Sequence, residues 1–162
     1  MSIDRLTASP PARWLIAALA LGGASLGASR VLTPGPVTTV VSMLLALAIL
    51  AVTALAGAGA ARRGQRPGWA GALPGLVYGL VSGLGAFFQH ETLSQARALL
   101  RAEPSRAPIT AAAVARAANA TSTHLIQFLA SALVLAVFGI VVGSLGGAFA
   151  RRAGESRAAD GD

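Results

Sequence analysis

The chain alternates between long apolar stretches and short polar segments that contain arginine, proline and glycine. A helix needs about 20 apolar residues to cross a hydrocarbon core about 30 Å thick. Four stretches reach this length, and we expect membrane spans at about 14–32, 37–61, 68–88 and 125–150. The pattern therefore predicts an all-α polytopic membrane protein, a four-transmembrane-helix bundle that forms a single membrane domain over 14–150.

The first span has a second interpretation. Arg5 and Arg13 precede an apolar run that starts at Trp14 and continues into small residues, which is also the pattern of a secretory signal peptide. As a span, this segment would need Arg30 to extend its side chain to the membrane interface. The sequence leaves both interpretations open: a retained span, or a cleaved signal peptide that leaves three spans.

The long connection 89–121 between the third and fourth spans carries signals of helical structure. Thr92 to Gln95 matches a capping box, so we expect a helix that ends near Glu103, before Pro104. Thr110 is placed to cap a second short helix over 111–118. We expect a short amphipathic helical segment on the outer surface, which is either an ordered connector or a lid or partner-binding element.

Arginine density predicts which ends face the cytoplasm. With a cytoplasmic amino terminus, eight arginines lie inside and five outside. The link between the second and third spans alone holds Arg62, Arg63 and Arg66. We therefore expect a multi-pass protein of the cell membrane, with a cytoplasmic N-terminal segment at 1–13 and a cytoplasmic, disordered tail at 151–162. A composition rich in alanine, glycine and arginine suggests a bacterial inner membrane.

Glycines recur at intervals of four residues in the last two spans. Such a ridge lets the backbone of another helix approach closely, which is how helices associate in lipid. We expect these ridges to mediate contact between helices, within one subunit or at the seam of a homo-oligomer. The predicted helix-packing residues are Gly71, Gly75, Gly79 and Gly83 in the third span, and Gly139, Gly143 and Gly147 in the fourth.

Composition excludes several kinds of chemistry. The chain is 54% hydrophobic and 12% charged, with net charge +7. It has no cysteine and no lysine, which excludes disulfides, cysteine metal sites and lysine nucleophiles. The arginines lie between apolar runs rather than on one soluble face, so we expect no nucleic-acid partner. No acidic residue lies within a span, which disfavours proton-driven exchange. We expect no catalytic residue, metal ligand or cofactor, and no enzymatic activity.

Polar residues cluster near the outer ends of the third and fourth spans. Helical spacing places Tyr78, Ser82 and Gln89 on one stripe, and His124, Gln127 and Ser131 on another. His90 and Glu91 follow the third span directly. If the stripes face each other, a polar recess opens outward, and the alternative is a set of interfacial residues that bond between helices.

These patterns support two hypotheses for function. The first is a small non-catalytic membrane protein that acts through glycine-ridge helix packing and contacts with a second copy or another membrane protein within the lipid bilayer. The alternative is a passive channel or small-solute transporter that uses the polar outer recess.

Overall fold

The structure is a computed structural model that describes residues 12–32, 35–102 and 109–159. Within these ranges it is all-α without strands, and four of its helices are long and apolar enough to cross a membrane, which confirms the predicted fold class. The elements are α2 (Ala12–Val31), α3 (Pro36–Arg62), α4 (Pro67–Gly83), η1 (Leu84–Phe88), α5 (Leu93–Ala102), α6 (Ala111–Ala118) and α7 (Thr121–Ala159).

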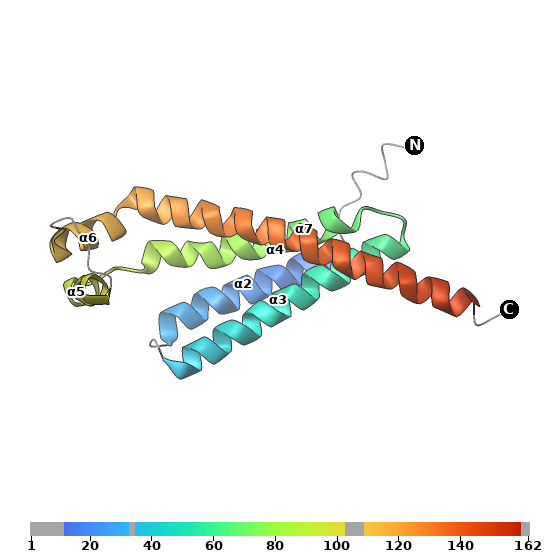
Figure 1. Cartoon of the computed structure of the whole chain (residues 1–162), viewed down its shortest axis with the longest axis horizontal. Coiled ribbons are helices and arrows are strands. Elements are labelled where there is room, and N and C mark those ends of the chain that lie inside the picture. Colours follow the sequence, from blue (N-terminus) through green and yellow to red (C-terminus); the bar gives the residue numbers. More distant parts are fainter. Residues whose placement is uncertain (1–11, 33–34, 103–108, 160–162) are drawn as a thin grey trace.

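The helices form two arms that separate toward one end of the molecule (Figure 1). One arm pairs α4 with α7, and the other pairs α2 with α3. The α3–α4 turn and the end of α7 lie at the end where the arms meet, while α5 and α6 sit at the far tip of the α4–α7 arm. That the joined end faces the cytoplasm stays a prediction.

Local sequence explains where the spans begin and end. Pro36 and Pro67 start α3 and α4, because a helix can begin on a residue that has no amide proton to donate. Between these helices the chain reverses at Gly64, whose φ of +69° suits glycine. The amide of Gly64 donates to the carbonyl of Ala61 at 3.0 Å, and that of Gln65 to Ala60 at 2.9 Å.

The outer segment between η1 and α7 has the two predicted helix caps. The Thr92 amide donates to Gln95 Oε1 at 2.8 Å, and the Gln95 amide donates to Thr92 Oγ1 at 3.3 Å, which confirms the capping box. Thr110 Oγ1 accepts from the amide of Ala113 at 3.2 Å and starts α6. The predicted stop at Glu103 and Pro104 lies outside the described residues.

The last helix is longer than the sequence pattern predicts. We expected the span to end near 150 and the tail 151–162 to be disordered, but α7 continues to Ala159. Arginine, alanine and glutamate have high helix propensity, so a helix already formed in the membrane extends into water without renewed nucleation. Ser156 Oγ donates to the carbonyl of Arg152 at 3.2 Å within this extension.

Glycines bring the backbones of α4 and α7 into direct contact. A Cβ added to Gly71 would overlap the carbonyl oxygen of Gly139, and one on Gly75 would overlap that of Leu135. A Cβ on Gly79 would lie 2.8 Å from the Ala132 Cα. The glycine ridges therefore face each other within one chain, and large apolar side chains point outward.

The joined end of the bundle is closed by further small residues. A Cβ on Gly57 of α3 would overlap the carbonyl oxygen of Gly143, and one on Gly146 would overlap that of Ala54. Close backbone contacts thus tie α3 to α7. Farther along the bundle, α2 packs on a side chain of α4, since a Cβ at Gly22 would lie 2.8 Å from Val81 Cβ.

Candidate functional site

A polar cavity lies between α2, α4–η1 and α7, on the side where the arms separate. Its volume is about 320 Å³. Hydroxyl and amide side chains from three helical segments supply the polar part of its wall, and none of the lining residues is ionisable. The lining residues are Ser25, Ser29, Ser82, Gly83, Gly85, Ala86, Gln89, Gln127 and Ser131.

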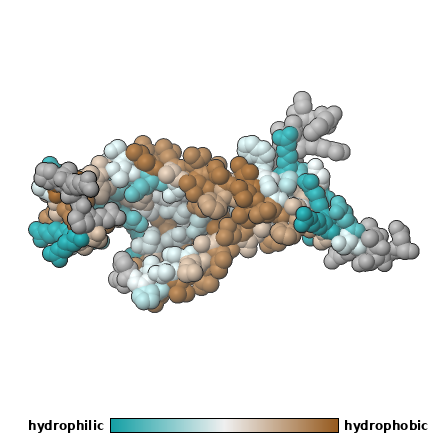
Figure 2. Space-filling model, in the orientation of Figure 1, coloured by the Kyte–Doolittle hydropathy of each residue, from teal (hydrophilic) through white to brown (hydrophobic). Residues whose placement is uncertain are grey.

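Two further cavities, of about 310 and 430 Å³, adjoin the first one. All three share Ser29 and Gln89 in their walls, so we treat them as one recess and call it the outer groove. The two added cavities form its mouth, where Arg30, His90 and Glu91 contribute ionisable groups. Figure 2 shows hydrophilic colours between the two arms, bordered by the hydrophobic surface of the spans.

The serines in the groove keep part of their hydrogen-bonding capacity. Ser29 Oγ donates to the carbonyl of Leu26, and Ser82 Oγ to that of Tyr78, each at 2.8 Å. These bonds use the hydroxyl protons and leave oxygen lone pairs that accept. Gln89 and Gln127 are exposed, and their amides bond to no other described residue. The groove therefore offers both donors and acceptors to an occupant.

The local fold of η1 places Gln89 beside α2. The chain tightens from α4 into a 3₁₀ turn over Leu84–Phe88, and Gln89 follows in extended conformation. The turn packs against α2 at Gly85, where an added Cβ would lie in ordinary contact with Ser29 Oγ, at 3.6 Å. The same turn presents Phe88, whose ring lies under the Arg30 guanidinium, with Cζ 3.6 Å from the ring centroid.

The structure separates the residues predicted to form a recess. Four of them, Ser82, Gln89, Gln127 and Ser131, line the inner cavity, while His90 and Glu91 line the mouth. Tyr78 instead lies in the apolar core with Ala18 and Ile49. His124 is 9% exposed and lines none of these cavities, because its ring packs 6.0 Å from Phe87 and 6.3 Å from His90 between centroids.

A single asparagine holds the mouth residue Glu91 in place. The Glu91 amide donates to Asn119 Oδ1 at 2.8 Å, and Asn119 Nδ2 donates to the Glu91 carbonyl at 2.9 Å. Glu91 Oε2 is buried and has no hydrogen-bond partner in the described part of the chain. Across residues 12–32, 35–102 and 109–156, no three His, Asp or Glu side chains are grouped to hold a metal ion.

Sequence reasoning missed the contribution of the first two spans to the groove. Ser25 and Ser29 lie one helical turn apart on α2, followed by Arg30, and Thr38 of α3 completes the mouth. The serine spacing is a signal, because residues at i and i+4 share one face of a helix. The spacing alone does not show which element these serines face, and the fold shows that they lie beside η1.

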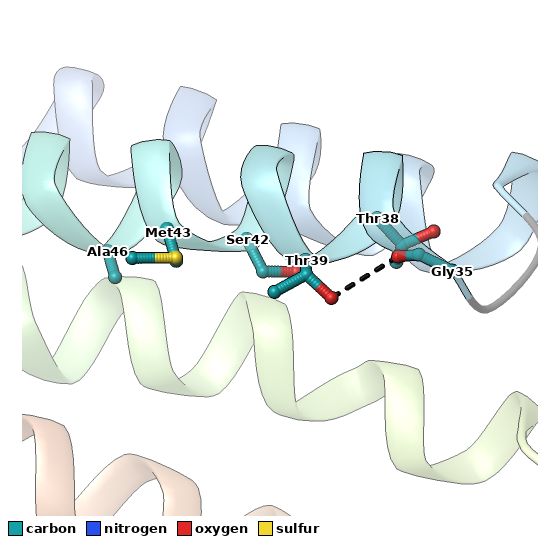
Figure 3. A pocket seen from close by; sticks show the side chains of 6 residues that line it. All are labelled: Gly35, Thr38, Thr39, Ser42, Met43 and Ala46. Atoms are coloured by element: carbon teal, nitrogen blue, oxygen red, sulfur yellow. Dashed lines mark hydrogen bonds between the residues drawn. The ribbon is translucent and has the colours of Figure 1, made fainter.

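A shallow cavity of about 480 Å³ lies on α3 and continues from the mouth through Thr38. Figure 3 shows Thr39, Ser42 and Ala46 on one side of this helix, with Thr39 Oγ1 donating to the Gly35 carbonyl at 3.2 Å. Hydroxyl groups therefore extend from the mouth along the outer half of α3.

Comparison with known proteins gives no relative of this chain: no family model, curated protein or solved structure matches it. The four apolar helices fit a small integral membrane protein that crosses the membrane several times.

Proposed function

We propose that this protein is a non-catalytic integral membrane protein that binds a polar group of a membrane component in the outer groove. The observation that carries the proposal is the wall of the inner cavity, where four serines and two glutamines from three helical segments converge. Polar groups at membrane depth are costly unless they are satisfied, so their convergence favours a bound group over a purely structural role.

Binding fits the groove better than catalysis does. A serine nucleophile needs a base within hydrogen-bond reach, but the Ser29 and Ser82 hydroxyls donate to carbonyls of their own helices. His124 packs against the rings of Phe87 and His90 instead, and no hydrogen bond joins His90 to a groove serine in the described part of the chain. The glycine contacts give the groove a rigid frame, which favours a site built for recognition.

Among the described helix faces that carry paired glycines, one is free to contact a second copy or another membrane protein. The α4 and α7 ridges are occupied within the chain, whereas a Cβ on Gly23 or Gly27 of α2 would meet nothing within 4 Å. Those two glycines form a small-xxx-small pattern of the kind that mediates helix association in lipid. A homo-oligomer, if it forms, would therefore use α2 and not the α4–α7 seam.

Thiol labelling tests whether the groove is a polar site open to water. The chain lacks cysteine, so Ser131→Cys and Leu133→Cys introduce single thiols two residues apart on α7. Ser131 lines the groove, and Leu133 is 66% exposed on the apolar surface. In phosphatidylglycerol proteoliposomes, a membrane-impermeant thiosulfonate should modify Ser131→Cys much faster, because thiolates form in water and not in hydrocarbon. Equal rates at the two positions would refute the proposal.

A passive channel or small-solute transporter is the second candidate, and the hydrogen-bonding wall of the groove favours it. Such a path must also cross the joined end, where Gly57, Gly71 and Gly146 bring backbones into contact. Flux into liposomes separates the two functions. Solute entry above that of empty vesicles, reduced by Ser82→Leu in the groove wall, would support transport, whereas a binding protein gives no such flux.

A further inference from the structure

The mouth of the outer groove carries two opposite charges that are not paired with each other. Arg30 lines the cavity of about 310 Å³, and Glu91 lines the adjoining one of about 430 Å³. Neither forms an ion pair within the described part of the chain. The Arg30 guanidinium lies over the Phe88 ring, with Cζ 3.6 Å from the ring centroid, and its donors form no hydrogen bond within the described part of the chain.

Glu91 differs from an ordinary surface carboxylate. Its backbone is fixed by both hydrogen bonds to Asn119, and its Oε2 is buried with no hydrogen-bond partner among the described residues. A buried acceptor without a partner costs free energy that a bound donor would recover. The mouth therefore has one site for an anion and another for a hydrogen-bonding cation.

We infer that the outer groove binds the headgroup of a zwitterionic phospholipid that carries a primary ammonium, with its phosphate at Arg30 and its ammonium at Glu91. This inference rests on the proposed function and names its ligand class. Guanidinium edges match phosphate oxygens in paired, charge-assisted hydrogen bonds. A primary ammonium has protons to give to Glu91 Oε2, which accepts from no described residue.

The position of the groove favours a lipid over a free solute. Its mouth lies at the ends of membrane-spanning helices, where lipid headgroups reside, and the groove lies between the arms on a face bordered by hydrophobic surface. Val31, Val37 and Phe88 beside the mouth are 81%, 66% and 54% exposed and can contact acyl chains. Deeper in the groove, Gln127 can donate to the ester carbonyls of the glycerol backbone.

The other polar groups at the mouth are compatible with this arrangement. His90 lines both mouth cavities, and its side chain hydrogen-bonds to phosphate or ester oxygens when it donates. A purely anionic headgroup would place its charge beside Arg30 but leave Glu91 without a counterion. The pair of charges thus predicts a preference for the ammonium-bearing lipid.

Competition between two lipids tests the inference on the full chain. Protein purified in detergent is mixed with equal amounts of phosphatidylethanolamine and phosphatidylglycerol, and one-to-one complexes are counted by native mass spectrometry. We expect phosphatidylethanolamine to be favoured about tenfold, the scale of one charge-assisted hydrogen bond. Glu91→Gln should bring that ratio close to one, while Arg30→Gln should weaken both lipids.

Charge-matched variants serve as controls. Glu155→Gln and Arg97→Gln neutralise exposed groups outside the groove and should leave lipid selection unchanged. The inference is wrong if Glu91→Gln keeps the wild-type ratio of the two lipid complexes, or if the wild-type protein prefers phosphatidylglycerol. The ratio measured for Glu91→Gln is sufficient for this test even if Arg30→Gln does not fold. Soluble phosphoethanolamine should compete only weakly. Displacement of the lipid by equimolar phosphoethanolamine would assign the site to a free zwitterion instead.

The two proposals fail in different ways. Faster labelling of Ser131→Cys than of Leu133→Cys in phosphatidylglycerol vesicles supports the groove as a polar site whatever lipid it prefers. If that difference is present but lipid selection is absent, the lipid inference is wrong and the proposed function stands. If the difference is absent, both are wrong.

Discussion

The seam between α4 and α7 predicts that one added methyl group destabilises the fold. In Gly79→Ala the new Cβ would lie 2.8 Å from the Ala132 Cα and 2.9 Å from the Ser131 carbonyl oxygen. The shorter distance is about 0.6 Å less than the 3.4 Å at which ordinary van der Waals contact begins. Both neighbours are backbone atoms, so relief requires the two helices to separate.

A separation of this size has a cost that can be estimated. A gap of 0.5–1 Å removes about a quarter to a half of each contact worth roughly 0.1–0.2 kcal/mol. For roughly 40 atom pairs along the seam, about the number that one buried leucine makes, the loss is about 1–4 kcal/mol. Forcing a methylene group into a well-packed core typically costs about 1–3 kcal/mol, which overlaps this range.

Gly59→Ala is the matched control, because its Cβ on α3 would meet only Arg63 Nη1, at the ordinary contact distance of 3.5 Å. Unfolding in mixed micelles with increasing sodium dodecyl sulfate, followed by circular dichroism, gives both free energies. We expect Gly79→Ala to lower the free energy of unfolding by about 1–3 kcal/mol, while Gly59→Ala leaves it unchanged or slightly raises it. Equal stability of the two variants would show that the α4–α7 backbones are not in contact.

Three further predictions concern the loops. Thr92→Ala should destabilise the start of α5 by about 1 kcal/mol and speed amide hydrogen exchange at Gln95. Thr92→Ser keeps the hydroxyl and should leave the exchange rate unchanged, so equal rates in the two variants would contradict the capping role. Asn119→Ala should raise proteolytic cleavage around Glu91 because both hydrogen bonds are lost, and Asn119→Asp, which keeps only the acceptor, should fall between it and wild type. Gly64→Ala should lower the free energy of unfolding by about 1 kcal/mol or more because φ is +69°, and an unchanged melting temperature would contradict a left-handed conformation at this turn.

Sequence periodicity was sufficient for the spans but not for the groove. Apolar runs and prolines define α3 within a residue of the expected bounds, because span length is set by membrane thickness. Helical spacing showed which face of its own helix carries Ser82 or Gln127. It did not show which other helix would lie opposite that face. Tyr78 shares its helical stripe with Ser82, yet it lies in the apolar core, where Ala18 of α2 and Ile49 of α3 cover it. Only the arrangement of helices brings Ser25 into the site.

The close contacts and the open groove have one physical origin. Helices in lipid gain little from burying apolar side chains, so they stay together where bare backbones touch and separate where bulkier groups intervene. Toward the joined end, Gly71 and Gly139 meet backbone to backbone. Toward the outer end, where the two arms separate, Ser131 and Gln127 of α7 line the groove together with residues of α2 and of the 3₁₀ turn. Filling the gap with apolar side chains would let the arms close, whereas hydroxyl and amide groups keep a recess that retains its need for hydrogen-bonding partners.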